Sequence, residues 1–169
     1  IRHASKFILI GSGNPEEGEL RPQLLDRFGL SVEVMTPDTV HERIEIIQRR
    51  DQYDNNPEGY VLDWQKENKK LRNKIQKARK NLNSVSVDNK ILENCAEICI
   101  DLGSDGLRGE LTLVRTARAL AALSNSSSVD QAQLRKIAPM ALSHRLRRDP
   151  LDDAGSGTRV ARSVEKIIG

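Results

Sequence analysis

Asn14 has a side chain that could act on a phosphate group. It follows the apolar run Phe7–Ile10, and open α/β sheets bind their ligands beyond the carboxyl ends of buried strands. An amide can both donate and accept hydrogen bonds, so Asn14 could orient a water molecule against a phosphate. The alternative is that Asn14 only caps the turn before Pro15, and its spacing alone favours that structural role.

Arg27 could neutralise negative charge on a neighbouring subunit's nucleotide. Leu24, Leu25 and Phe28 flank it and are expected to pack, so that a rigid element holds the guanidinium. An arginine at a subunit edge can reach the γ-phosphate next door, where charge builds during hydrolysis. A salt bridge to Asp26 or a nearby glutamate is the alternative, which the sequence alone favours.

Arg108 stands in the first turn of an expected helix, and Arg115 follows seven residues later. Side chains seven apart lie on the same helix face, so the two arginines could meet phosphates together. A solvated helix face is the alternative.

The remaining basic, thiol and imidazole groups indicate ordinary structural roles. Residues 65–80 hold eight lysines or arginines and one acid, Glu67, but apolar residues alternate with them and no aromatic residue could stack bases. We therefore expect an amphipathic surface helix and no nucleic-acid site. The smaller basic cluster at 144–148 has the same interpretation. Cys95 and Cys99 are expected in the core, and the three histidines lack metal-ligand spacing, so we expect no metal site.

The elements that would position Asn14 and Arg27 are two strands and a short helix. Phe7–Ile10 reads as a strand buried on both faces, Pro22–Phe28 as a short helix, and Leu30–Val34 as a second strand. Such a βαβ unit needs partner strands. We therefore expect the chain to be part of a longer protein.

The rest of the chain is expected to be helical. The first helix starts at Thr36-Pro37 and ends at Asn55–Pro57, and a long one follows over about 58–82. Three later helices start at Asp88, at Leu107 and at the capping box of Asp130 with Gln133; Pro139 is expected to kink or end the last. The apolar stripe of the helix from Asp88 consists of Ile91, Cys95, Ile98 and Leu102. That of the helix from Leu107 consists of Leu111, Val114, Ala117 and Ala121. A tail with a weak final helix follows from Asp149.

Composition excludes several classes of protein. The chain has 169 residues, a net charge of +3 and only two cysteines, so a disulfide scaffold is excluded. It has no apolar run of the length that a membrane span requires. It also has no G-x-x-x-x-G-K-[ST] phosphate loop and no strand that ends in an acidic pair for Mg²⁺. This chain alone is not expected to bind ATP well.

Three stretches together resemble the ATPase (I) subunit family of magnesium chelatase, AAA+ proteins of chlorophyll and bacteriochlorophyll synthesis. They are Gly11–Gly29 (GSGNPEEGELRPQLLDRFG), Asp105–Glu110 (DGLRGE) and His144–Leu151 (HRLRRDPL). The resemblance covers nearly the whole chain. The first stretch is specific to this family, whereas Leu-Asp-Arg-Phe alone would also fit MoxR-type AAA+ ATPases.

The resemblance implies a role for each candidate residue. Asn14 matches sensor 1, which positions the attacking water. Arg27 matches the arginine finger that acts on ATP in the adjacent subunit, and Asp26 shapes that interface. Arg108 matches sensor 2 on the helical lid, which touches the γ-phosphate.

The resemblance also implies an α/β fold: the C-terminal part of an AAA+ module plus an all-α lid. Residues 1–35 would end the α/β core, 36–84 form a helical insertion that displaces the lid, 85–148 form the lid, and 149–169 a tail. The cofactors would be ATP and Mg²⁺, with the phosphate loop and the Mg²⁺ ligands outside this chain.

Family members form homo-oligomeric rings, expected here as a hexamer, and work with a second AAA-like subunit and a large porphyrin-binding subunit. ATP hydrolysis drives Mg²⁺ insertion into protoporphyrin IX, in the bacterial cytoplasm or the plastid stroma. Two other readings stay open. One is a MoxR-like chaperone that remodels a metalloprotein; the other is a non-catalytic helical adaptor without nucleotide response.

Overall fold

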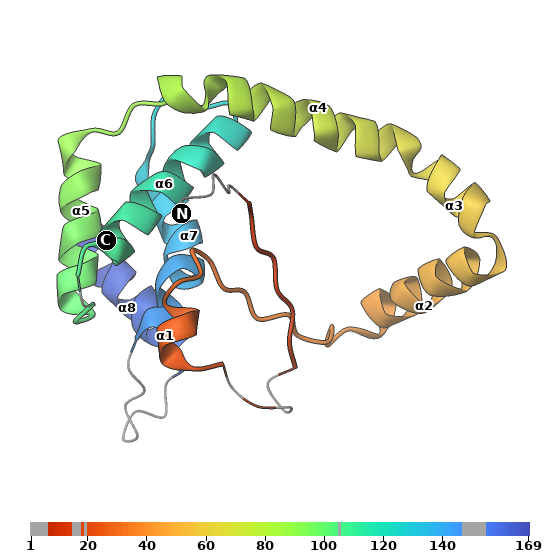
Figure 1. The fold of residues 1–169 in the computed structure, drawn as a ribbon, viewed down its shortest axis with the longest axis horizontal. Helices are drawn as coiled ribbons and strands as arrows, with labels where there is room; N and C mark the ends of the chain where they lie inside the picture. The colour runs from red at the N-terminus through yellow and green to blue at the C-terminus, as the bar shows by residue number, and fades with distance from the viewer. Residues whose placement is uncertain (1–6, 15–17, 19, 105, 147–154) are drawn as a thin grey trace, which may run out of the picture.

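The computed structural model describes residues 7–14, 18, 20–104, 106–146 and 155–169. Pro15, Asp105 and the start of the expected tail at 149–154 lie outside these residues. The helices, shown in Figure 1, are α1 (Pro22–Leu25), α2 (Val40–Asn55), α3 (Pro57–Asp63), α4 (Gln65–Asn81), η2 (Leu82–Ser84), α5 (Asn89–Asp101), α6 (Arg108–Leu123), α7 (Gln131–Leu142), η3 (Ser143–Arg145) and α8 (Ser156–Ile168).

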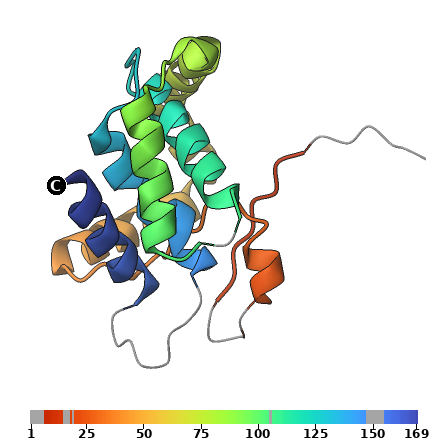
Figure 2. The same cartoon turned by 90° about the vertical axis from the view of Figure 1, so that its left-hand side faces the viewer.

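The two expected strands are not strands in the described part of the chain. Ile8 and Val34 are 91% and 90% exposed, and both segments run as extended chain beside the helices (Figure 2). A strand exists through hydrogen bonds to a neighbour, and neither segment pairs with a strand among the described residues. The described residues do include one isolated parallel bridge, between Ser86 and Ser128.

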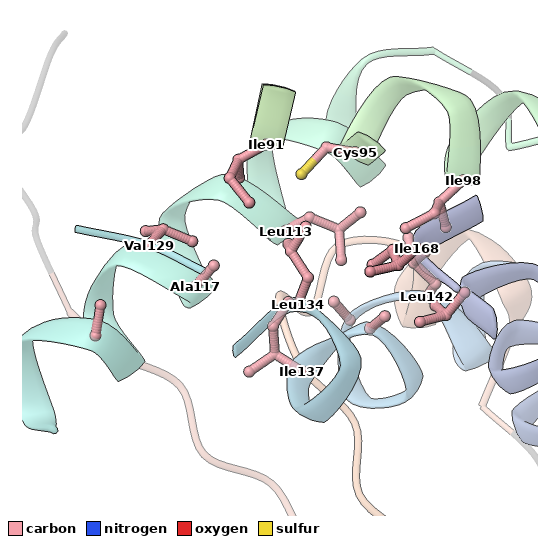
Figure 3. Close-up of a cluster of buried hydrophobic side chains, with 14 of the residues drawn as sticks. Ile91, Cys95, Ile98, Leu113, Ala117, Val129, Leu134, Ile137, Leu142 and Ile168 are labelled. Atoms are coloured by element: carbon pink, nitrogen blue, oxygen red, sulfur yellow. The ribbon is translucent and has the colours of Figure 1, made fainter. Parts of the chain in front are cut away.

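The core lies between α5, α6, α7 and α8. Leu113 of α6 and Leu134 of α7 are fully buried there, and Ile98 of α5 faces them (Figure 3). Alanines on α6 and α7 allow the two helices to pack closely, since a methyl side chain adds little to the distance between helix axes. These helices form a single hydrophobic cluster, so the expectation that this part of the chain is all-helical is confirmed.

Local capping signals set where two of these helices begin. Asp88 accepts a hydrogen bond from the Ile91 amide at 2.8 Å. Asp130 and Gln133 form the expected reciprocal capping box, with the Gln133 amide 3.0 Å from Asp130 Oδ1. Both predictions are confirmed, because capping depends on side chains within three residues of the helix start.

Pro139 was expected to kink or end its helix, and it does not end it. α7 continues to Leu142 with Pro139 inside it. Ala138, Ala141 and Leu142 are all fully buried. Burial of this last turn outweighs the backbone hydrogen bond that the proline ring removes.

The C-terminal segment contributes a full helix to the core. Val160 of α8 is fully buried, and Val164 and Ile168 are 4% and 8% exposed. α8 packs against α5 and α7. These spacings of four place three apolar side chains on one face, so the segment expected to be a weak tail helix completes the bundle.

Helices α2, α3 and α4 form an arm that leaves the bundle and returns to it along α4 (Figure 1). The arm starts at Thr39, not at Thr36, since Thr39 Oγ1 accepts a hydrogen bond from the Glu42 amide. The expected long helix is interrupted at Trp64. Leu71 and Ile75, two of the apolar residues of α4, are 55% and 44% exposed.

Aromatic side chains hold the bend of the arm. The Tyr53 and Tyr60 rings lie 5.9 Å apart, edge to face, and Trp64 lies 6.0 Å from Tyr60. The Arg49 guanidinium lies 5.2 Å from the centre of the Trp64 ring.

Across the residues that the structure describes, no helix has both the length and the apolar character needed to cross a bilayer.

Candidate functional site

Asp26 lies where the turn after α1 meets α6 and η3. Its carboxylate pairs with two arginines from distant parts of the chain. Arg145 Nη1 lies 2.6 Å from Oδ1 of Asp26, and Arg108 Nη1 donates to Oδ2. These partners are 119 and 82 residues away in the sequence. The ion pairs therefore join the N-terminal segment to the helical bundle.

Arg145 is the buried centre of these contacts. Its side chain is 4% exposed. Nη1 donates to the Asp26 carbonyl oxygen at 2.7 Å, Nη2 to the Phe28 carbonyl oxygen at 2.7 Å, and Nε to the Ala141 carbonyl oxygen at 2.9 Å. Nη2 also lies 3.5 Å from Thr112 Oγ1. The interpretation of Arg145 as part of a solvated basic cluster is therefore wrong, because its donors find acceptors on three different segments.

Arg108 is the first residue of α6 and remains half exposed, at 56% of its side chain. The next residue, Gly109, is buried, and a Cβ there would lie 3.0 Å from both Cys99 Sγ and Ser104 Oγ. Glycine thus allows the start of α6 to approach the end of α5 closely. This close packing fixes the backbone from which Arg108 reaches Asp26.

His144 and Met140 fasten the segment after Asp26 to the bundle. Nε2 of His144 lies 3.1 Å from the Phe28 carbonyl oxygen, and the Ser31 amide donates to the Met140 carbonyl oxygen at 2.9 Å. Burial lowers the pKa of His144, the Phe28 hydrogen bond opposes that shift, and the neighbouring Arg145 adds to it. A neutral ring with its proton on Nε2 fits this contact, since the buried Nδ1 has no hydrogen-bond partner.

Arg27 lies beside this cluster but outside its ion pairs. Its side chain is exposed, whereas Leu25 and Phe28 are half-buried. Its backbone amide donates to the Leu24 carbonyl oxygen at 3.0 Å. The carboxylate of Asp26 is paired with other arginines, so Arg27 presents its guanidinium to solvent from a turn whose neighbours are anchored.

Asn14 and Arg115 are not brought into the contacts of Asp26. Asn14 is exposed in the extended segment 7–14, and Arg115 is exposed on α6. Of the residues singled out in the sequence, the structure thus joins Asp26 with Arg108. It adds Arg145 and His144, which the sequence marked only as members of the basic cluster 144–148 and of the stretch His144–Leu151.

The two thiols belong to the core, as expected. Burial raises the pKa of Cys95 to about 11 and that of Cys99 to about 12, and the nearby Glu110 adds to both shifts. The thiolate, which is the reactive and metal-binding form, is therefore scarce at neutral pH. Within the described ranges, no group of three or more metal-binding side chains comes together.

The arrangement favours binding of an anion. Arg108 and Arg145 both pair with the one carboxylate of Asp26, and the exposed Arg27 is its neighbour in the sequence, so these four side chains together carry an excess of positive charge. Arg27 and Arg108 are both accessible, and guanidinium groups match the geometry of phosphate oxygens. Arg145 is buried and fully engaged with protein acceptors, which assigns it to holding the site together.

Comparison with known proteins supports the resemblance seen in the sequence. Residues 92–167 match the family model described as the AAA lid domain. The chain is 58% identical over 168 residues to the magnesium-chelatase 38 kDa subunit of Rhodobacter capsulatus, which covers 99% of this chain and 48% of that protein. It is 42% identical to the chloroplastic magnesium-chelatase subunit ChlI of Nicotiana tabacum, with 99% and 39% covered.

The fold also has a solved relative. A crystal structure of a protein assigned as an ATPase, from Cytophaga hutchinsonii, superposes with a TM-score of 0.66 over 90% of this chain and 49% of that one. At 15% identity this likeness shows the fold alone. The chain spans about half the length of the curated relatives it matches. Its similarity to magnesium-chelatase 38 kDa subunits, expected from the sequence, is confirmed over nearly its whole length.

Proposed function

We propose that this chain is part of an ATP-hydrolysing AAA+ motor that drives Mg²⁺ insertion into protoporphyrin IX. The proposal starts from its similarity to the magnesium-chelatase 38 kDa subunits and from its match to the AAA lid domain. The observation that carries the proposal is the ion-paired contact between Asp26, beside the exposed Arg27, and Arg108 at the start of the lid helix α6. It connects Arg108, which is suited to sensing a nucleotide, with the turn that carries Arg27, which is suited to acting on the nucleotide of a neighbouring subunit.

Each candidate residue has a distinct task in this proposal. Arg27 reaches the ATP of the adjacent subunit and neutralises the charge that builds on the γ-phosphate, an effect of about 10³-fold or more in related nucleotide hydrolases. Arg108 contacts the γ-phosphate of its own site and reports nucleotide state to the lid. Asn14 orients the attacking water, and Asp26 shapes the interface at which Arg27 acts.

The residues present fit the phosphates of ATP but not its metal ion. The accessible guanidinium groups of Arg27 and Arg108 are suited to phosphate oxygens. Mg²⁺ requires carboxylate, carbonyl and water oxygens, and the described residues hold no cluster of acidic side chains. We therefore assign no Mg²⁺ ligand to them, and the phosphate loop is likewise proposed to belong to the remainder of the subunit.

The proposed organisation follows the expected segments. Residues 1–35 belong to the end of an α/β core, 36–84 to a helical insertion, 85–148 to the lid and 149–169 to a C-terminal segment. The burial of α8 against α5 and α7 supports counting α8 with the lid. The assembly proposed is a homo-oligomeric ring, a hexamer, with a second AAA-like subunit and a large porphyrin-binding subunit, in the bacterial cytoplasm or plastid stroma.

The test is Arg27→Ala in the complete subunit. ATP binding is expected to persist while turnover is lost, because the arginine acts on the transition state in a neighbour. In rings that mix variant with wild-type subunits, each variant should disable the site of one neighbour and keep its own, so activity should fall in proportion to the variant fraction. Arg135→Ala, which removes an arginine of α7 that pairs with Glu165 of α8, is the matched control. Near-normal turnover in Arg27→Ala would remove the finger assignment.

Two further measurements address the lid and the substrate. Arg108→Ala is expected to weaken nucleotide-dependent closure of the lid; unchanged nucleotide affinity and turnover would contradict that role. Stimulation of porphyrin metallation by the complete subunit, together with its partner subunits, would distinguish a chelatase motor from a chaperone-type AAA+ protein. An adaptor would show no dependence on ATP or on Arg27.

A further inference from the structure

We infer that Arg145 is a positioning residue for Arg27, an inference that rests on the proposed finger role of Arg27. The guanidinium of Arg145 binds the carbonyl oxygens on both sides of Arg27. Nη1 donates to the Asp26 carbonyl oxygen and Nη2 to the Phe28 carbonyl oxygen, each at 2.7 Å. The backbone that carries Arg27 is thereby held at two points by one planar group.

The group that holds this backbone is itself fixed. Nε of Arg145 donates to the Ala141 carbonyl oxygen in the last turn of α7, at 2.9 Å. The side chain is 4% exposed, so water does not compete for its donors. Asp26 Oδ1, 2.6 Å from Nη1, adds a charge-assisted contact. Because the Arg145 guanidinium is fixed to the bundle in this way, it holds the turn at a defined position relative to the bundle.

On the side before Arg27, the other long-range contact comes from Arg108, which is half exposed and donates to the Asp26 carboxylate and, at 3.3 Å, to the Asp26 carbonyl oxygen. α1 is only four residues long, which is too short to be stable alone, and Leu24 within it is 45% exposed. The contacts of His144 with Phe28 and of Ser31 with Met140 hold the side after Arg27. Arg145 reaches both sides. Because misplacement of a catalytic group by about 1 Å can cost on the order of 100-fold in rate, loss of this hold should impair the finger.

The test is Arg145→Lys in the complete subunit. A lysine keeps the positive charge near Asp26, but its ammonium lacks the fork that spans two carbonyl oxygens. We expect kcat for ATP hydrolysis to fall about 10- to 100-fold, with KM for ATP changed by less than about twofold. In hydrogen exchange followed by mass spectrometry, peptides over 21–30 should exchange faster, while those over α5–α8 stay protected. Arg135→Ala should leave all three readouts unchanged.

Three outcomes would overturn the inference. Wild-type kcat in Arg145→Lys, where Arg27→Ala is inactive, would show that the finger does not need this hold. Loss of protection throughout α5–α8 in Arg145→Lys would show that Arg145 serves only the core. Normal turnover in Arg27→Ala would remove the finger itself, and that single variant distinguishes failure of the proposed function from failure of the positioning role.

Discussion

Replacing Asp26 by asparagine should destabilise the chain through its contact with Arg145 far more than through its contact with Arg108. Arg145 is 4% exposed, Asp26 47% and Arg108 56%. A hydrogen bond to a charged group contributes about 1.5–3 kcal/mol, whereas an exposed ion pair contributes about 0–1 kcal/mol. Because Asp26 is half exposed and Arg145 keeps its carbonyl acceptors, we expect Asp26→Asn to cost about 1–2 kcal/mol, and Arg108→Ala about 0.5 kcal/mol.

The assay is urea unfolding of the chain, followed by far-ultraviolet circular dichroism. Asp26→Asn should cost nearly as much in an Arg108→Ala background as in the wild type, because the buried contact is still lost. High salt should reduce the effect of Arg108→Ala, since exposed charges are screened. Asp54→Asn breaks an exposed pair with Arg50 at 2.7 Å and serves as the control, with an expected cost of about 0.3–0.5 kcal/mol. Equal costs for Asp26→Asn and Arg108→Ala would refute this reasoning.

Three other variants or conditions test the structure. Leu113→Ala should destabilise the chain by about 2–5 kcal/mol, and Leu111→Ala on the same helix by less than about 0.5 kcal/mol, because Leu113 is fully buried and Leu111 is 51% exposed; similar urea midpoints would contradict the helix orientation. The pKa of His144 is lowered in the folded chain, so the unfolded chain binds a proton first as pH falls through about 6.5. The free energy of unfolding should therefore decrease toward pH 5, by at most about 1.4 kcal/mol per pH unit. His144→Gln should reduce that slope, and an unchanged slope would count against the role of His144. Cys95 and Cys99 should resist iodoacetamide at pH 8 until the chain unfolds, because burial raises both thiol pKa values; rapid labelling of the folded chain, measured by mass spectrometry, would show that they are accessible.

Helix starts could be predicted from the sequence where one local capping signal was present. The prediction failed where two local signals competed. The caps at Asp88 and Asp130 were predicted because each acts within three residues. At the start of α2 the sequence offers both Thr36-Pro37 and Thr39. The structure uses Thr39, whose hydroxyl accepts from the Glu42 amide and donates to the Glu42 carboxylate.

Helix faces and helix ends were harder to predict, because neighbours decide them. Leu111 was assigned to the buried stripe of α6, but Leu113 occupies the core. Pro139 was expected to kink or end α7, but the helix continues through the buried turn after it. In both cases burial against other helices outweighed a preference that can be read locally.

The candidate site shows the same division. The types and spacing of Asn14, Asp26, Arg27 and Arg108 were enough to indicate the family and to propose a phosphate-sensing role. Nothing in the sequence pairs Asp26 with an arginine 119 residues away or distinguishes Arg145 from the other basic residues of the 144–148 cluster.

By itself, then, the sequence determined the helical caps, the buried thiols and the resemblance to chelatase ATPase subunits, because these depend on side chains within a few residues or on a continuous motif. Only the tertiary structure decided that α8 completes the core and that Arg145 is buried between the helical bundle and the turn of Arg27. The physical reason is that burial and long-range ion pairs depend on how distant segments pack, and this packing is a property of the whole bundle.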